Sequence, residues 1–228
     1  MTGGNPPGRL IGAGRAADVY DLGSGRVLRR YRISANAEPE ARLMRYLREA
    51  GLGVPEVFDA DGTDLVMARI DGADLLSDLS RRPWRAARHG VTLARMHDQL
   101  HEIQAPSWLK RPFGDGDRVL HLDLHPGNVM MTAGGPMIID WSNGAAGPPG
   151  ADVAMASVIM STSEIDDLPM PVRLIAERLR RRVIKQFESR VSHDFRPYLT
   201  TVAKLRMVDR NVRPAEVIVL QQIVDRQP

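Results

Sequence analysis

His121-Leu-Asp-Leu-His-Pro-Gly-Asn128 is the most informative segment of this chain, and Ile138-Ile-Asp-Trp141 follows it, which places Asp140 twelve residues beyond Asn128. Asp123 and Asn128 stand five residues apart around a Pro-Gly turn, where their side chains can converge. Asp140 follows an apolar run that is typical of a buried strand. A carboxylate and an amide oxygen suit Mg²⁺, and a second carboxylate can accept a proton from a substrate hydroxyl.

The spacing of these polar residues matches the plan of kinases. That plan has a catalytic-loop aspartate, an asparagine five residues later and a metal-binding aspartate further along the chain. Taken singly, each residue is better explained as a cap of a turn or of a helix. Taken together, and with His121 two residues before Asp123, they predict a site for phosphoryl transfer.

A glycine-rich segment near the start supports the same chemistry. Gly12-Ala-Gly-Arg-Ala-Ala-Asp-Val19 fits the pattern G-x-G-x-x-G-x-V, with Ala17 in place of the third glycine. A dinucleotide-binding turn is the usual competitor, but it requires a helix directly after the loop. Here a strand pattern and a Gly-Ser-Gly turn follow instead. We therefore expect Gly12, Gly14 and Val19 to contact the phosphates of a nucleotide.

A kinase also needs a cation on its third strand, oriented by a glutamate. Residues 1–109 contain no lysine, so an arginine must supply this cation. Arg29 shares a strand face with Val27 and Tyr31, and Arg30 lies opposite. In a helix predicted over 37–49, Glu40 falls on the inward stripe, and the outer face takes Glu38, Ala41, Arg42 and Arg45. We predict an Arg29–Glu40 pair; arginines on an exposed edge strand are the alternative.

The periodicity divides the chain near Asp71-Gly72. Residues 1–70 form a β-rich part with one helix, with strands expected at 10–11, 19–22, 27–31, 54–57 and 65–67. Residues 71–228 form a helical part, with helices expected over 84–103, 151–162, 172–190, 197–209 and 214–225 and strands near 119–120 and 137–139. The fold class expected is α+β.

The chain resembles the aminoglycoside phosphotransferase family of small-molecule kinases. His121 to Val129 resembles the family's catalytic loop, H-G-D-x-H-x-x-N-x. Residues 139–154 resemble its I-D-W/F…G-x-P-x-x-D-x-A segment, and the similarity runs from about Ile11 to Ala154. The resemblance implies a bilobal, protein-kinase-like fold. Residues 1–70 would be the nucleotide-binding lobe, and residues 71–228 the catalytic and substrate-binding lobe.

The resemblance also implies roles for particular residues. It implies ATP or GTP with Mg²⁺, and transfer of the γ-phosphate to a hydroxyl of a small molecule. Asp123 would be the catalytic base, Asn128 and Asp140 the metal ligands, and Asp152 a brace for the loop. The segment 65–69, which includes Met67 and Arg69, would be the hinge that meets the adenine. The chain departs from the family pattern in Leu122 for the usual glycine, in Arg29 for lysine and in a short C-terminal lobe.

Composition restricts the alternatives. With no cysteine, disulfides, thiolate catalysis and zinc–thiolate sites are excluded. No apolar run reaches the roughly 18 residues of a membrane span, and the first residues do not resemble a signal peptide, so we expect a cytoplasmic protein without a membrane partner. The formal net charge is only +3, although the segment from Arg173 to Arg190 carries seven basic and two acidic residues.

Three further hypotheses stay open at the level of sequence. The missing lysine is compatible with a nucleotide-binding pseudokinase, and the basic segment with an arginine-rich nucleic-acid-binding domain, although no nucleic acid is expected as partner. His97 and His101, four apart on a helix, are a weak zinc pattern without an evident third ligand. Glu164, Asp166 and Asp167 offer some carboxylates for a polycationic acceptor, but the acceptor is not identified.

Overall fold

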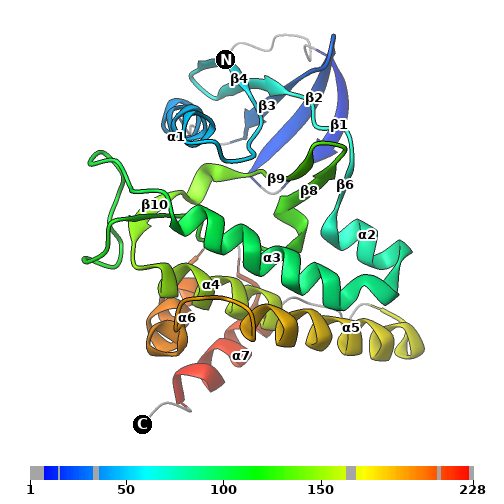
Figure 1. The fold of residues 1–228 in the computed structure, drawn as a ribbon. Helices are drawn as coiled ribbons and strands as arrows, with labels where there is room; N and C mark the ends of the chain where they lie inside the picture. Colours follow the sequence, from blue (N-terminus) through cyan, green and yellow to red (C-terminus); the bar gives the residue numbers. More distant parts are fainter. Residues whose placement is uncertain (1–7, 15, 33–35, 163–167, 210–211, 226–228) are drawn as a thin grey trace. The chain divides into compact units, whose positions relative to one another are not determined.

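The computed structural model describes residues 8–14, 16–32, 36–162, 168–209 and 212–225 (Figure 1). The chain divides into two compact units. The first comprises Met1–Gly72 and Met130–Ser142, and the second comprises Ala73–Val129 and Asn143–Pro228. The first unit therefore also includes residues 130–142, which follow the catalytic-loop motif in the sequence.

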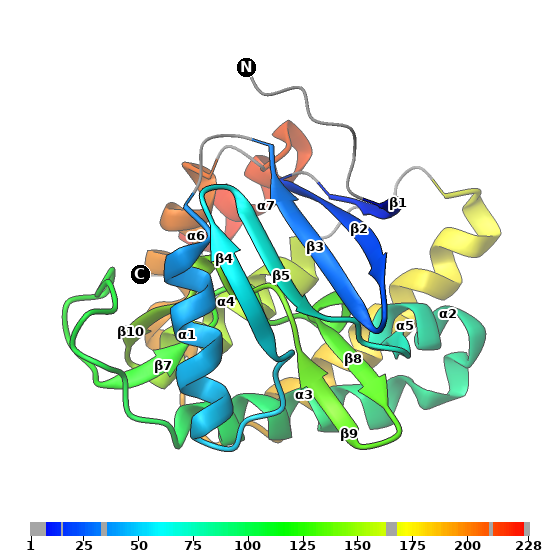
Figure 2. The same ribbon diagram turned by 90° about the horizontal axis from the view of Figure 1, so that it is seen from above.

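The first unit is built on a five-stranded antiparallel sheet with the strand order β1-β2-β3-β5-β4 (Figure 2). Because β3 is the central strand, most of its side chains are buried, and they lie on both faces of the sheet, Arg29 and Leu28 included. Arg29 is therefore not on an exposed edge. The strands are β1 (Arg9–Ala13), β2 (Ala17–Gly23), β3 (Arg26–Tyr31), β4 (Val57–Asp61) and β5 (Asp64–Ala68).

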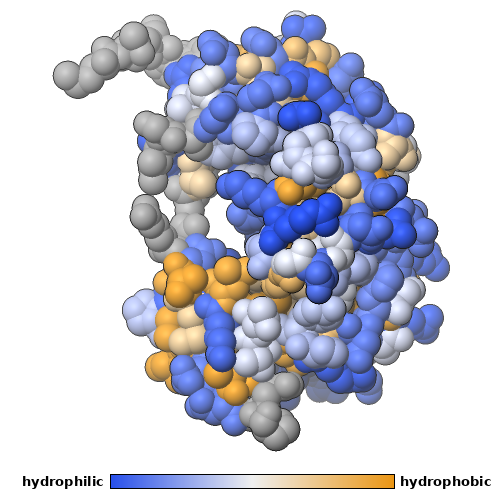
Figure 3. Space-filling view, turned by 90° about the vertical axis from the view of Figure 1, so that its left-hand side faces the viewer, coloured by the Kyte–Doolittle hydropathy of each residue, from blue (hydrophilic) through white to orange (hydrophobic). Residues whose placement is uncertain are grey.

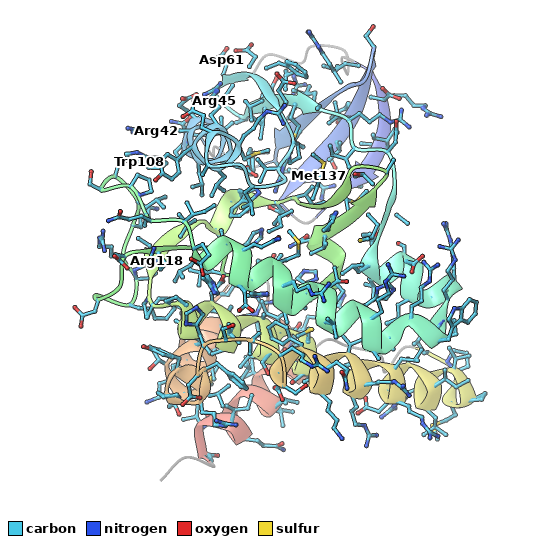
Figure 4. The ribbon with its side chains drawn as sticks, in the orientation of Figure 1. Arg42, Arg45, Asp61, Trp108, Arg118 and Met137 are labelled. Carbon is cyan, nitrogen blue, oxygen red and sulfur yellow. The ribbon has the colours of Figure 1, made fainter. Side chains whose placement is uncertain are left out.

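One helix, α1 (Glu38–Glu49), accompanies this sheet. Pro39 in the first turn and acidic residues at the N-terminal end are favourable for helix initiation. The inward stripe of Glu40, Leu43, Met44 and Leu47 is buried as predicted. Arg45 pairs with Glu38 on the outer side, where Figure 4 also shows Arg42. Ala41, expected on that outer face, is instead fully buried.

Two further strands, β8 (Val129–Thr132) and β9 (Gly135–Ile138), are neighbours in a second sheet. β9, where Figure 4 labels Met137, is attached to the first unit by a hydrogen bond from the Ile138 amide to the Gly53 carbonyl, 2.8 Å long. This attachment explains why residues 130–142 belong with the N-terminal sheet. It also delivers Asp140 to that unit.

The second unit is mainly helical (Figure 1). Helix α4 has buried residues on almost every side, which makes it the centre of the core. Gly90 of α3 lies so close to α5 that an added Cβ would meet the Val183 carbonyl oxygen at 2.4 Å. The helices are α2 (Leu75–Arg81), α3 (Ala86–His101), α4 (Pro149–Thr162), α5 (Met170–Glu188), α6 (Leu199–Met207) and α7 (Pro214–Asp225).

Short elements complete this unit. Strands β7 (Arg118–Leu120) and β10 (Ala145–Gly147) pair antiparallel, and β6 covers Ala73–Asp74. The single-turn 3₁₀ helices are η1 (Pro83–Arg85), η2 (Pro126–Asn128), η3 (Trp141–Asn143, shared with the first unit) and η4 (Arg196–Tyr198). None of the helices in the described part of the chain combines the length and the apolar character that a bilayer crossing requires.

The secondary structure corrects several sequence-based expectations. The strand expected at 54–57 begins only at Val57, because Pro55 has no N–H to donate to a ladder. The helix expected over 84–103 is shorter and follows a 3₁₀ turn. Helix α2 was not expected, although Asp74 caps it by accepting a hydrogen bond from the Ser77 amide at 2.8 Å. The sequence signal for this helix was Asp74 three residues before Ser77, a spacing typical of a helix N-cap.

Candidate active site

The glycine-rich loop joins β1 to β2 in the first unit. Gly12 lies opposite Val19 in the β1–β2 ladder. The amide of Gly14 donates to the Ala17 carbonyl at 2.9 Å and closes the turn. A Cβ at Gly14 would lie 2.9 Å from that same oxygen, so only glycine fits here without a shift. The predicted strand–loop–strand arrangement is therefore present, and no helix follows the loop.

Arg29 on β3 is bound by two carboxylates within the first unit. Its Nη1 donates to Glu40 Oε1 at 3.0 Å, and its Nη2 donates to Asp140 Oδ1 at 2.6 Å. The Arg29–Glu40 pair predicted from the sequence is thus confirmed, and the Asp140 contact joins residues 111 positions apart. Burial lowers the pKa of Arg29, but Glu40 and Asp140 outweigh it, so the pKa is raised overall. The guanidinium is a permanent cation in this network.

Glu40 connects α1 to the segment that carries Asp140. Its Oε1 accepts a hydrogen bond from the Trp141 amide at 2.9 Å, and its Oε2 accepts one from the Tyr31 hydroxyl. Burial raises the pKa of Glu40 to about 7, although Arg29 and the Trp141 amide act in the opposite direction. Glu40 consequently fixes the position of the residue directly after Asp140.

The backbone at Asp140 has an uncommon conformation. Its φ is +64°, in the left-handed region that aspartate tolerates better than most residues. Ser142 Oγ donates to Asp140 Oδ1 at 2.9 Å, so this oxygen receives bonds from two side chains. Trp141 is almost fully buried and donates from Nε1 to the Ile138 carbonyl at 3.1 Å. The tryptophan therefore belongs to the core of the first unit.

The segment expected to form a hinge lies at the end of β5. Met67 is partly buried and lies opposite Val27 of β3 and Val57 of β4. Arg69 donates to Asp21 at 2.6 Å and to Asp71 at 3.1 Å. These contacts place both residues beside the first-unit strands; their predicted role in meeting the adenine stays a prediction.

The catalytic-loop motif lies in the second unit, between β7 and β8. The Asn128 amide nitrogen donates to the Asp123 carbonyl at 2.8 Å and to the Asp123 carboxylate at 3.2 Å. Since the nitrogen is engaged in this way, the amide oxygen is the atom that suits a cation. His125 Nδ1 accepts from the Gly127 amide at 3.1 Å, and its Nε2 lies 3.9 Å from Asp123 Oδ1. Asp123 and Asn128, five positions apart in the sequence, are thus in direct contact.

Asp152 of α4 braces this loop, as the family resemblance implied. Its Oδ1 accepts from the backbone amides of His121 at 3.2 Å and Leu122 at 2.6 Å. Its Oδ2 lies 3.0 Å from His101 Nε2. Burial raises the pKa of Asp152, but hydrogen bonding and charge from His101 outweigh it, so the pKa lies well below the usual range. Asp152 is a buried carboxylate with a positioning role.

Leu122 has a φ of +61°, where a side chain is strained. This conformation explains why the family pattern has glycine at this position. The sequence did not reveal His101 as a partner of Asp152, because its spacing from His97 suggested only a weak zinc pattern. Within the described part of the chain, no group of three or more histidine, aspartate or glutamate side chains is arranged to hold a metal ion.

His97 is fully buried beside this brace. Its Nδ1 lies 3.0 Å from the Leu93 carbonyl, and its ring packs 4.9 Å from that of Phe187. Among the described residues its Nε2 has no hydrogen-bond partner. Burial lowers the pKa of His97 to about 4. The ring is therefore a neutral part of the core.

Asp140 belongs to the first unit, and Asp123 and Asn128 belong to the second. A β-unit with one helix that holds an arginine–glutamate–aspartate network, and a helical unit with a braced Asp–Asn loop, together define an α+β fold of the kinase-like phosphotransferases. The chain belongs to the phosphotransferase enzyme family, whose model matches residues 7–118 and 59–187.

Solved structures with this fold are distant in sequence. An aminoglycoside phosphotransferase, APH(2'')-Ib with ADP, is 12% identical with a TM-score of 0.60, covering 96% of this chain and 92% of that chain. An ethanolamine kinase from Plasmodium vivax is 13% identical with a TM-score of 0.62, covering 94% of this chain and 80% of that chain. The amicoumacin kinase hAmiN, in complex with AMP-PNP and Ca²⁺, is 14% identical with a TM-score of 0.57, covering 95% and 87%. A search of curated proteins finds no match.

Proposed function

We propose that this protein is a small-molecule kinase that transfers the γ-phosphate of ATP or GTP to a hydroxyl group. One observation carries the proposal. The Asp123–Asn128 loop is held by the buried Asp152 through two backbone amides, which is more precise positioning than a solvent-exposed turn needs. Such preorganisation is what a catalytic base requires.

The proposed reaction is a direct displacement at phosphorus. The acceptor oxygen forms a bond to the γ-phosphorus while the bond from that phosphorus to the bridging β–γ oxygen breaks, and the nucleoside diphosphate leaves. Asp123 accepts the hydroxyl proton. Its carboxylate is about a quarter exposed, so substrate can reach it, and Asn128 holds it from the opposite side of the turn.

The oxygen atoms of Asn128 and Asp140 fit Mg²⁺, which favours carboxylate and amide oxygens and retains water and phosphate ligands. When bound, the ion would neutralise charge on the β- and γ-phosphates. Gly12, Gly14 and Val19 would line the phosphates, Arg29 with Glu40 would orient them, and Met67 with Arg69 would lie at the adenine. Support comes from structures of similar fold that hold ADP or AMP-PNP.

A small-molecule acceptor is supported by a structure of similar fold that holds streptomycin together with ATP. Glu164, Asp166 and Asp167, the carboxylates considered for a polycationic acceptor, lie outside the described residues. Figure 3 shows apolar side chains gathered on the lower part of its view, where α6 and α7 lie in Figure 1. Leu205, Val208 and Ile218 are the most exposed of the large apolar residues on and directly after these two helices. Among the described residues, this face is therefore apolar in character.

A nucleotide-binding pseudokinase is the second candidate, and Arg29 favours it. The arginine binds Asp140 at 2.6 Å, so the predicted metal ligand is already engaged by a cation. A planar guanidinium is not equivalent to the compact ammonium of lysine. Measured phosphate transfer decides between the two candidates.

The first test is Asp123→Ala. We expect phosphate transfer to fall by about a hundredfold to ten-thousandfold, since the base is removed, with nucleotide affinity retained. Transfer is measured as nucleoside diphosphate production with a panel of hydroxyl acceptors. Asp117→Ala, which removes a carboxylate of 62% exposure on the same unit, is the matched control and keeps wild-type activity. Equal loss of binding and transfer contradicts the proposed role, and no transfer by the wild type with any acceptor favours the pseudokinase.

A further inference from the structure

The first turns of α5 are exposed on every side. All six residues from Met170 to Ile175 are exposed. Met170 is 64% exposed, Leu174 63% and Ile175 59%. The helix is anchored only further along, where Val183 and Phe187 are buried. We call Leu168, Met170, Val172, Leu174 and Ile175 the α5 tip.

A basic stretch follows the α5 tip on the same helix. Met170, Leu174, Arg178, Arg181 and Lys185 are spaced by four, four, three and four residues, so they share one face. Arg178, Arg181, Arg182 and Lys185 are all exposed. Glu177 is the one acidic side chain of these turns, and it pairs with Arg180 and Arg181. This face of α5 is therefore apolar at its N-terminal end and cationic further along the helix.

The apolar α5 tip next to a basic stretch favours one class of binding partner over others. In a symmetric pairing of two copies, the same patch faces itself, and its carboxylate, Glu177, is already paired with arginines of its own helix and so does not complement the basic stretch of a second copy. Single-stranded nucleic acid is usually bound by stacking on aromatic rings, and the α5 tip has none. Apolar side chains beside arginines suit a surface that offers both hydrocarbon and negative charge.

We propose that the α5 tip docks this protein on an anionic membrane surface, with the apolar side chains in the interfacial region and the basic stretch on lipid headgroups. The docking is peripheral and involves no spanning helix. It differs from the expectation of no membrane partner, because the sequence does not reveal which apolar residues of α5 stay outside the core. The inference is independent of the phosphate-transfer reaction.

The test is cosedimentation of the full chain with vesicles. We expect binding to vesicles of phosphatidylcholine and phosphatidylglycerol in equal parts, and much weaker binding to phosphatidylcholine alone. Reversing the charge of Arg181 and Arg182 together should weaken binding at least about 25-fold, since each basic residue near such a surface contributes about fivefold. Leu174→Glu with Ile175→Glu should weaken it by on the order of 100-fold, about tenfold for each side chain removed from the apolar region.

Ile218→Glu on α7 is the matched control, because Ile218 is 64% exposed and has no comparable basic stretch beside it. It should bind like the wild type, and circular dichroism checks that every variant is folded. Equal binding to both vesicle types, or unchanged binding of the tip variant, overturns the proposal. So does a dimer seen by light scattering that the tip variant abolishes while vesicles do not bind, or a preference for an oligonucleotide over the vesicles.

Discussion

Arg29 is the residue on which most of the first-unit site depends. It separates Glu40 from Asp140, and its side chain is only 9% exposed. A buried ion pair that loses one partner leaves an uncompensated charge, which is far more costly than losing an exposed pair. Arg30, on the same strand, binds Asp64 at a partly exposed position and therefore provides a natural comparison.

We expect Arg29→Ala to lower the free energy of unfolding by roughly 3–5 kcal/mol, because two carboxylates then face each other without a cation. Arg30→Ala should cost at most about 1 kcal/mol. Denaturant titration measures both values. Arg29→Lys, which keeps the charge, should recover most of the loss and preserve nucleotide binding. A larger effect at Arg30 than at Arg29 would contradict this account of β3.

Leu122 offers a second prediction at this scale. Its left-handed backbone costs a non-glycine residue about 1–2 kcal/mol, part of which glycine recovers despite its greater freedom in the unfolded chain. Leu122→Gly should therefore raise the free energy of unfolding by about 0.5–1 kcal/mol. Leu122→Val should lower it, since a β-branched side chain tolerates this conformation poorly. Thermal unfolding of the two variants distinguishes the outcomes, and a loss on changing to glycine argues against strain.

At the scale of elements, His101 of α3 and Asp152 of α4 bind each other beside the Asp123–Asn128 loop, and Asp152 accepts hydrogen bonds from the two backbone amides that precede this loop. His97 lies one turn before His101 on α3, and their rings meet edge to face at 5.8 Å. Because burial lowers the pKa of His97 from 6.5 to about 4, the unfolded chain binds more protons than the folded chain between these values. Folding is therefore favoured above this window and loses stability as the pH falls through it.

We expect His97 to contribute to acid destabilisation between pH 6.5 and about 4, by on the order of 3 kcal/mol in total. Asp152, whose pKa is lowered, loses its contribution only at still lower pH. His97→Gln should make the free energy of unfolding less dependent on pH within this window. Below the window, protonation of Asp152 should still lower the free energy of unfolding. Urea titrations at pH 7.5 and 4.5 provide the measurement. An unchanged slope in the variant would mean that another group carries the effect.

At the scale of the whole molecule, ligand binding reports on the proposed site without an identified acceptor. A nucleotide at about 100 times its dissociation constant adds about 2.7 kcal/mol to the stability of the native state. We expect ATP or GTP with Mg²⁺ to raise the melting temperature, and Asp140→Asn to abolish the Mg²⁺-dependent part. Asparagine also tolerates the left-handed backbone at this position, so the variant should fold. No shift with either nucleotide would contradict the proposed nucleotide site.

Local patterns in the sequence were sufficient for much of the fold and for part of the site. The spacing of apolar residues predicted α1 and α7, and the face assignment on two elements predicted the Arg29–Glu40 pair. The strand at 54–57 and the outward position of Ala41 were wrong, because packing around a residue depends on neighbours from other segments. Helix α2 was missed since its 7 residues are too few to show a helical period.

The amino-acid sequence specifies the identity and spacing of the chemical groups: an aspartate and an asparagine in one turn, a later aspartate after an apolar run, and an arginine where lysine is usual. Which of these groups meet depends on the tertiary structure. It paired Arg29 with Asp140 across 111 positions, turned His101 toward Asp152 and left the α5 tip outside the core. The physical reason is that periodicity specifies a face of an element, whereas burial and ion pairing depend on the elements that pack against that face.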